Sequence, residues 1–76
     1  MREYYFTLIM SPLDVQSYYY AQGGSAVVVT TDQGLRVQIA MRNLVPFITS
    51  NGIRGRFRLQ TDLQHKFISL QKIVDL

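Results

Sequence analysis

The sequence GIRGRFRL, from Gly52 to Leu59, alternates between apolar and basic residues in the manner of a β-strand. Side chains along a strand point to opposite faces in turn, so Ile53, Phe57 and Leu59 share one face. The other face then carries a row of three arginines: Arg54, Arg56 and Arg58. Like charges this close on one sheet face repel one another, so we expect an anionic ligand or a protein partner against this row.

The chain has 76 residues, which we interpret as a single domain over residues 1–76. A domain of about 60 residues buries only about 60% of its unfolded surface, so a chain this short gains little stability from its core alone. It contains no cysteine, which excludes a disulfide framework and a thiolate metal site. Hydrophobic residues make up 47% and charged residues 17%. Small apolar chains often complete their burial by associating, so we expect a homo-oligomer such as a dimer.

Positive charge is concentrated in the second half of the chain. Residues 1–35 contain one basic and three acidic side chains, a balance of −2, whereas residues 36–76 contain seven basic and two acidic side chains, a balance of +5. Together they give the net charge of +3. A basic half favours an anionic partner such as nucleic acid, another polyanion or an acidic protein surface. The alternative is that the arginines only keep an apolar domain soluble.

No targeting or membrane segment is evident in the sequence. Glu3 and Pro12 interrupt the amino-terminal region, which makes it a poor core for a signal peptide. The longest uncharged run, residues 15–31, contains glutamines, glycines and serines and is too polar for a membrane span of about 20 apolar residues. We therefore expect a cytoplasmic protein with no membrane partner.

The first 20 residues predict a strand followed by a helix. Residues 3–10 are rich in aromatic and β-branched side chains and are apolar on both faces, which is typical of a strand covered on both sides or lying at a dimer seam. Ser11, Pro12 and Asp14 suit the first turn of a helix, as cap, first helical residue and favourable negative charge. That helix should reach about residue 20.

The next two strands predict a hairpin. Residues 26–31 and 35–40 are joined by a turn in which Asp32 is favoured and Gly34 supplies a positive backbone angle. The continuous run Val27–Val29 predicts that the first of these strands is buried on both faces.

The remaining residues predict a short helix and a second hairpin. A helical turn over residues 41–45 is limited by Pro46, and Asn51-Gly52 marks the turn that opens the arginine strand. The second hairpin turns near residues 61–64 and returns over residues 66–74. The buried side of the returning strand stays open, because apolar residues occur on both sides.

These elements define the predicted fold class, a single α+β domain. It consists of a small, bent, mainly antiparallel sheet of about five strands with one main helix and one short helix.

The sequence does not support a metal site, a cofactor or catalysis. His65 is the only histidine and there is no cysteine, whereas zinc takes about four nitrogen or sulfur ligands. General acid–base catalysis needs paired titratable groups in a pocket. Asp14 is accounted for by the helix start, and Asp32 and Asp62 by turns. We therefore expect a protein that is not an enzyme and holds no cofactor.

The leading functional hypothesis is a non-catalytic module that binds nucleic acid without sequence specificity. Alternate residues of a strand lie about 6.6 Å apart, a spacing that suits contacts from the arginine row to successive phosphates. The predicted binding residues are Arg36, Arg54, Arg56, Arg58 and Lys66 for phosphates, with Phe67 as a stacking surface. Residues 52–55 also match the GXXG loop of KH domains, but that loop joins two helices and this one opens a strand.

The alternative hypothesis is a protein-interaction module that associates with itself through a tyrosine-rich surface. Tyrosine at a wet boundary combines an apolar ring with a hydroxyl that finds a partner. Three consecutive tyrosines cannot all face the core of one helix, so at least one should lie at the surface. The predicted surface consists of Tyr5, Tyr18, Tyr19 and Tyr20.

Several short motifs give the chain a resemblance to one family. They are Tyr4-Tyr5-Phe6, Tyr19-Tyr20 with Gly23, Val27–Val29, Asp32–Gln38, Pro46–Thr49 and Asn51–Phe57. In these motifs the chain resembles a family of short bacterial proteins, found mainly in gamma-proteobacteria, that is known only as a domain of unknown function. The chain departs from the family pattern by extra residues around Ala21 to Ser25. The resemblance implies one domain in a bacterial cytoplasm, and it implies no catalytic residues.

Overall fold

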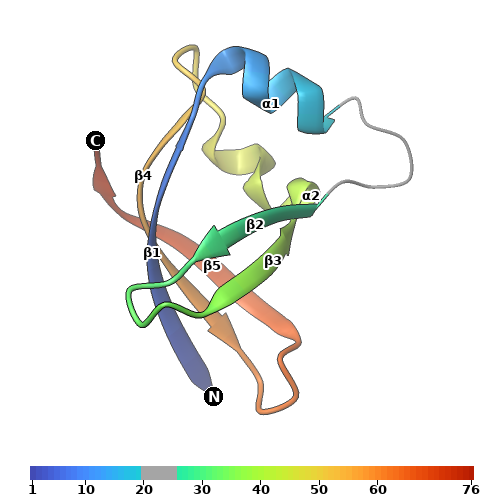
Figure 1. Ribbon diagram of the computed structural model, residues 1–76, viewed down its shortest axis with the longest axis vertical. Coiled ribbons are helices and arrows are strands. Elements are labelled where there is room, and N and C mark those ends of the chain that lie inside the picture. The colour runs from blue at the N-terminus through green and yellow to red at the C-terminus, as the bar shows by residue number, and fades with distance from the viewer. Residues whose placement is uncertain (20–25) are drawn as a thin grey trace.

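Within residues 1–19 and 26–76, which the computed structural model describes, the chain forms five strands, two α-helices and one 3-10 turn (Figure 1). In chain order these are β1 (Arg2–Met10), α1 (Pro12–Tyr19), β2 (Ala26–Thr30), β3 (Arg36–Ala40), α2 (Met41–Leu44), η1 (Val45–Phe47), β4 (Ile53–Thr61) and β5 (Phe67–Asp75). The predicted α+β class with five antiparallel strands is confirmed. The predicted end of the main helix, near residues 20–25, lies outside the described residues.

The long strands β1, β4 and β5 form an antiparallel sheet with β4 in the middle. β1 and β4 pair over all nine residues of each, and this register places Phe6 directly opposite Phe57. Both strands alternate between buried and outward-facing residues, as the period of two requires. The strand predicted from Gly52 to Leu59 is therefore confirmed, and it continues to Thr61.

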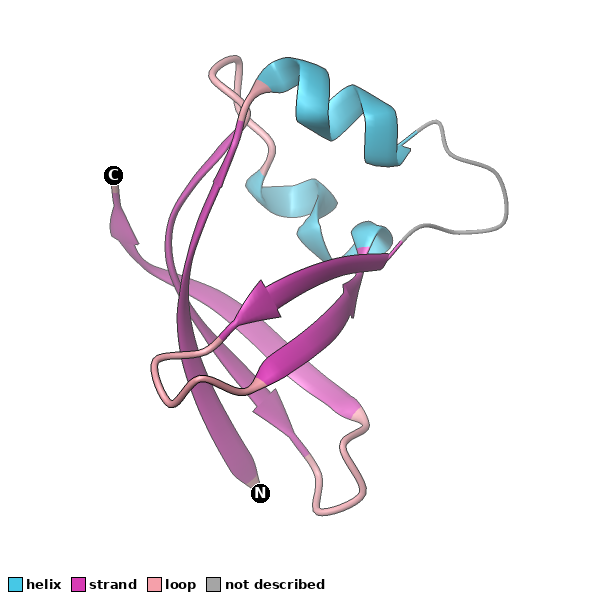
Figure 2. Ribbon diagram, in the orientation of Figure 1, coloured by secondary structure: helices cyan, strands magenta, loops and turns pink. Residues whose placement is uncertain are grey.

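Strands β2 and β3 form a second, two-stranded antiparallel sheet. Its turn joins the edge of β1 through one main-chain hydrogen bond, in which the Asp32 amide donates to the Tyr5 carbonyl oxygen at 2.8 Å. Figure 2 shows this hairpin beside the three-stranded sheet and below α1. The prediction of one bent sheet is thus corrected to two sheets, because the turn of the hairpin, and not its strands, pairs with β1.

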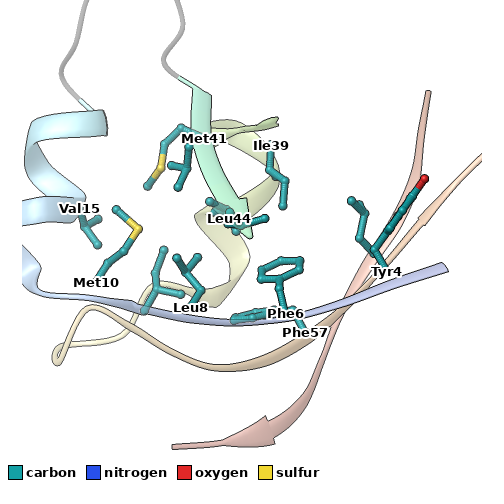
Figure 3. Close-up of a cluster of buried hydrophobic side chains, with 13 residues drawn as sticks. Tyr4, Phe6, Leu8, Met10, Val15, Ile39, Met41, Leu44 and Phe57 are labelled. Carbon is teal, nitrogen blue, oxygen red and sulfur yellow. The ribbon is translucent and has the colours of Figure 1, made fainter. Parts of the chain in front are cut away.

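The hydrophobic core lies between the three-stranded sheet and the elements that cover its inner face. Phe6 and Phe57 are fully buried and stack with ring centroids 5.5 Å apart. Leu44, also fully buried, reaches this layer from α2, and Val15 reaches it from α1 (Figure 3). The core also contains Tyr4, Leu8, Met10, Val27, Val29, Ile39, Met41, Ile53 and Leu59.

The β2 strand is covered on one face only. Val27 and Val29 are each 4% exposed, whereas Val28 between them is 44% exposed. The prediction of burial on both faces was wrong, because a two-stranded sheet that packs on the core has no layer on its outer side.

Local signals at the turns act as predicted. The Ser11 hydroxyl accepts from the Asp14 amide at 3.1 Å, and the Asp14 carboxylate accepts from the Ser11 amide at 3.2 Å, so the two residues cap α1 reciprocally. Gly34 has a φ of 83° and Gly52 a φ of 90°, both in the left-handed region that favours glycine. Among the described residues, no helix has the length and apolar character to cross a membrane.

The last strand, β5, pairs with β4 through two irregularities. The register shifts between Arg56 and Phe57 and again between Gln60 and Thr61, and at each shift β5 holds one extra residue, Ile73 and Ile68 respectively. Strict alternation is therefore broken, and the side that faces inward consists of Phe67, Leu70, Lys72 and Asp75, which pair with core-facing residues of β4. No residue of β5 is fully buried, and its half-buried residues, Ser69, Leu70 and Lys72, occur on both sides of the strand, so neither side alone is the buried one.

Candidate functional site

The arginine row projects from β4 on the face of the sheet turned away from the core. Arg54 lies opposite Ile9 of β1, Arg56 opposite Thr7 and Arg58 opposite Tyr5. The β1 residues Tyr5, Thr7 and Ile9 at this face are exposed, whereas Arg56 and Arg58 are half-buried by neighbouring side chains. The sequence correctly predicts that the three arginines share one face of an extended strand.

Arg56 is occupied by an acidic partner within the chain. Its two terminal nitrogens donate to the two carboxylate oxygens of Asp32, at 3.1 Å and 2.5 Å, and one of them also donates to the Thr7 hydroxyl at 3.0 Å. Hydrogen bonds from Arg56 hold the pKa of Asp32 below its ordinary value, and the same bonds raise the pKa of Arg56. A bidentate pair of this kind leaves little of the guanidinium free for a phosphate.

The other two members of the row also have partners. The Arg58 guanidinium donates to the Gln71 side-chain oxygen at 2.5 Å and lies 4.0 Å from the Glu3 carboxylate. The Arg54 Nε donates to the Leu76 main-chain oxygen at 3.4 Å. Arg54 borders a hollow of about 440 Å³ between the start of α1 and the residue 49–52 turn, and no other described residue of that lining has a charged side chain. The repulsion expected within the row is therefore relieved largely by groups of the same chain.

A second basic region lies on the opposite side of the molecule. It is a groove between β3 and the β4–β5 hairpin, formed by two adjoining hollows of about 310 Å³ and 220 Å³. We call it the β3 groove. The two hollows share Val37, Gln38, Thr61 and His65, and the remaining lining residues are Tyr4, Leu35, Arg36, Ile39, Ala40, Arg42, Asn43, Leu59 and Phe67.

Among the described residues that line the β3 groove, two are arginines and none is acidic. Arg36 and Arg42 are its two permanent cations, and both are exposed. The ion pairs found in residues 1–19 and 26–76 involve Arg56, Arg58 and Lys72, so neither groove arginine takes part in one. The two groove arginines therefore keep their charge unpaired by a carboxylate, in contrast to Arg56 of the arginine row, and the nearest acid in the hairpin loop, Asp62, is bonded to main-chain amides.

Phe67 and the hairpin loop form the far wall of the groove. Phe67 is the first residue of β5 and is 45% exposed, which leaves a large part of its ring in contact with solvent. The loop before it is fixed by Asp62, whose carboxylate accepts from the Gln64 and Lys66 amides at 2.8 Å and 2.9 Å. His65 in this loop has a φ of 67° and borders both hollows.

The structure thus divides the predicted nucleic-acid residues between two faces. Arg36 and Phe67 line the β3 groove, and Lys66 adjoins it between His65 and Phe67. The arginine row lies on the other side of the sheet and does not join them. The reason is that β3 and the hairpin loop lie on the core side of the three-stranded sheet, whereas the row points away from the core.

Two groove residues were missing from the predicted site. Arg42 counts toward the basic half of the sequence, but its place in α2 directly after β3 becomes meaningful only once β3 is known to border a groove. His65 lies in the loop between β4 and β5, and its position in the groove depends on the pairing of these two strands. The signal that could have identified Arg42 is a pair of basic residues at the two ends of a short strand, Arg36 at the start of β3 and Arg42 just after its end.

The predicted tyrosine surface is only partly described. Tyr5 is 37% exposed on the outer face of β1, and Tyr18 is 38% exposed on α1. The Tyr5 hydroxyl donates to the Glu3 carboxylate at 3.4 Å. The Tyr19 side chain and the whole of Tyr20 lie outside the described part of the chain.

Carboxylates and histidine are dispersed in the structure. Within the described residues, no three or more His, Asp or Glu side chains come together in a way that could hold a metal ion. Asp14, Asp32 and Asp62 have the structural partners given above, at a helix start, an ion pair and a turn.

A family comparison covers almost all of the chain. Residues 2–73 match a family described as a protein of unknown function, DUF2835. The chain belongs to the DUF2835 family. No curated protein and no solved structure matches it. The resemblance to a family of unknown function is therefore confirmed, and DUF2835 supplies no activity from which roles could be transferred to the residues of the β3 groove.

Proposed function

We propose that this DUF2835 protein is a non-catalytic module that binds single-stranded nucleic acid in the β3 groove, without strong sequence specificity. The observation that supports this most directly is the pair of exposed arginines, Arg36 and Arg42, in a groove that has no carboxylate in its lining. Gamma-proteobacterial origin and a cytoplasmic setting, which would give access to nucleic acid, belong to the same proposal.

Phosphate binding is favoured where cations have no competing acid. A phosphate that approached Arg56 would have to displace both carboxylate oxygens of Asp32, whereas Arg36 and Arg42 have no ion pair to give up. Each phosphate contact releases condensed counterions, which supplies much of the affinity of sequence-independent binding. The β3 groove therefore replaces the arginine row as the proposed contact surface.

The groove also offers a surface for a base. The half-exposed ring of Phe67 lies at one wall, and stacking of a base on an aromatic ring contributes about 1–3 kcal/mol whatever the base. Gln38 and Asn43 add side-chain amides along the same lining. Cations for the backbone together with one aromatic ring are typical of proteins that bind single strands without reading their sequence.

Fluorescence anisotropy with labelled single-stranded DNA and RNA oligonucleotides, at two salt concentrations, tests this proposal. The groove variant carries Arg36→Ala and Arg42→Ala, and the matched control carries Arg54→Ala and Arg58→Ala, so that both lose two positive charges. We expect binding by the wild type that weakens steeply with salt. The groove variant should lose affinity, with a salt slope smaller by about 1.4, since each contact to a single strand contributes about 0.7.

The control variant should bind nearly as the wild type does. Loss of affinity in the control but not in the groove variant would show that nucleic acid binds at the arginine row and not in the β3 groove. Undetectable binding by the wild type at low salt would reject the nucleic-acid function altogether. Circular dichroism of both variants checks that neither result reflects unfolding.

A further inference from the structure

Within the part of the chain that the structure describes, β5 has one edge without a partner strand. It lies at the end of the sheet order β1–β4–β5 and pairs only with β4 along its nine residues (Figure 1). Such an edge presents unpaired amide and carbonyl groups and is a template for another strand, unless prolines, charges or bulges protect it. β5 contains no proline, and its two bulges, at Ile68 and Ile73, bracket a regular segment of four residues, Ser69–Lys72.

Apolar side chains remain exposed along this edge. Phe67, Ile68, Ile73 and Val74 are 45–49% exposed, and Leu76 just beyond the strand is 52% exposed. At about 100 Å² apiece, half of what a large side chain buries, they leave roughly 500 Å² of apolar surface per chain. Two copies hold about 1,000 Å² of this surface between them, which equals the lower limit for a specific protein interface if all of it is covered.

Along this edge the pattern of charged, apolar and polar residues is nearly the same whether β5 is followed forwards or backwards, with charges of opposite sign at its two ends. Lys66 stands at one end and Asp75 at the other, an apolar pair lies inside each of them, and Ser69–Lys72 occupies the middle. A second copy running antiparallel therefore brings Phe67 and Ile68 of one chain to Ile73 and Val74 of the other. It also brings Lys66 near the opposite Asp75, whose side chain is 87% exposed although its carboxylate contacts Lys72.

We propose that the protein forms a symmetric dimer in which the free edges of two β5 strands pair antiparallel, giving one continuous six-stranded sheet. The partner is a second copy of this chain, because the edge is complementary to its own reverse in both charge and apolar residues. A two-fold axis that relates antiparallel neighbours runs perpendicular to the sheet. The cores, and with them the β3 grooves, then lie on the same side of the joined sheet.

Two registers satisfy this symmetry. A two-fold axis at Gln71 sets Ile68 opposite Val74 of the partner copy, and an axis at Leu70 sets Phe67 opposite Ile73. In either register the residue on the axis faces its own copy, with Cα atoms about 4.5–5.5 Å apart. That distance lies within the range that a disulfide can bridge.

Cysteine cross-linking tests the pairing directly, because the described chain has no free cysteine and the sequence contains none. Gln71→Cys and Leu70→Cys are compared with Val28→Cys, a 44% exposed position on the other sheet. We expect one of the two β5 variants to form a disulfide-linked dimer at micromolar concentration under mild oxidation, and the Val28 variant to remain monomeric. Equal cross-linking at all three positions would show random collision and overturn the proposal.

Sedimentation equilibrium without any nucleic acid gives a second test. The wild type should sediment at twice the 8.8 kDa of the chain. Ile73→Lys should weaken association at least tenfold, whereas Ile9→Lys, at a 56% exposed position on β1, should leave it unchanged. A monomeric wild type at tens of micromolar, or equal dissociation by both variants, would overturn the β5 dimer. Neither measurement uses nucleic acid, so each outcome is distinguishable from failure of the β3 groove to bind it, although Phe67 belongs to both surfaces.

Discussion

Asp32 and Arg56, 24 positions apart in the sequence, form a bidentate ion pair that connects the β2–β3 turn to β4, the middle strand of the other sheet. The Arg56 side chain passes Thr7 of β1 on its way and donates to the Thr7 hydroxyl. Together with the bond from the Asp32 amide to the Tyr5 carbonyl, this pair is a main polar connection between the two sheets.

The stability of the protein should therefore depend on pH through Asp32. Its pKa in the folded protein lies below the ordinary value of 3.8, because Arg56 stabilises the carboxylate. This stabilisation is fully present at pH values above 3.8, where the carboxylate is ionised in the folded and the unfolded protein. It is lost as the pH falls through the lower pKa of the folded protein. Chemical denaturation measured from pH 6 to pH 2 should show that the free energy of unfolding falls less with acid in Asp32→Asn than in the wild type.

A double-mutant cycle isolates the pair from other acid effects. At pH 7, Asp32→Asn and Arg56→Gln should each lower the denaturation midpoint, and the double variant should lose less than the sum of the two. Additive losses would show that the pair contributes nothing beyond its separate parts.

Gly52 should be irreplaceable. Its φ is 90°, and a Cβ atom built there would lie 2.0 Å from the Met10 carbonyl oxygen, which is main chain and cannot move aside. We expect Gly52→Ala to lower the free energy of unfolding by more than about 3 kcal/mol, as substitutions that combine strain and overlap do. Urea denaturation measures this loss.

Gly34 provides the matched control for Gly52. Its φ of 83° is similar, but a Cβ atom there has no neighbour within 4 Å. Gly34→Ala should therefore cost only the left-handed backbone conformation, about 1–2 kcal/mol. Equal losses at both glycines would mean that contact with Met10 is unimportant.

Truncation of Phe57 to alanine should lower the stability of the fold strongly, whereas truncation of Phe67, ten positions later, should lower it little. Phe57 is fully buried, stacks on Phe6 and meets the Phe47 ring edge to face at 5.3 Å. Phe57→Ala should cost about 3–5 kcal/mol of unfolding free energy, a large share of the about 5–15 kcal/mol available to a small domain. Thermal denaturation should show a large fall in Tm.

Phe67→Ala should leave the fold nearly intact, because the ring is already half exposed. If Phe67 stacks on a base, its loss should weaken oligonucleotide binding roughly fivefold or more. Unchanged affinity in the folded variant would remove Phe67 from the proposed groove contacts.

The Asp62 carboxylate should matter for the hairpin loop rather than for the core. It accepts hydrogen bonds from the main-chain amides of Gln64 and Lys66, and Asp62→Ala removes the acceptor of both. We expect a loss of about 1–2 kcal/mol, the usual net value of one or two exposed hydrogen bonds. Asp62→Asn, which keeps one acceptor oxygen, should recover most of it, as followed by urea denaturation.

Features with a local cause could be predicted from the sequence. The cap formed by Ser11 and Asp14, the glycine turns at Gly34 and Gly52, and the strand carrying the arginine row each depend on neighbouring residues and appear in the structure as expected. Their physical signals lie within a few positions of one another, so a single sequence contains them.

Features that depend on distant partners could not be predicted. The sequence places Asp32 in a turn, but only the position of that turn beside β1 brings its carboxylate to Arg56. The extra residues Ile68 and Ile73 break the alternation of β5, and no turn signal or glycine announces them. For the same reason the predicted nucleic-acid residues could not be assigned to two separate faces before the pairing of β1, β4 and β5 was known.

The two walls of the β3 groove belong to different sheets. One wall is β3, which pairs only with β2, and the other is the hairpin of β4 and β5. The shape of the groove therefore depends on how the two sheets pack against each other through their shared hydrophobic core. The contacts of Asp32 with Tyr5 and Arg56 join the two sheets, so protonation of Asp32 at low pH should weaken the attachment of the β2–β3 hairpin to β1.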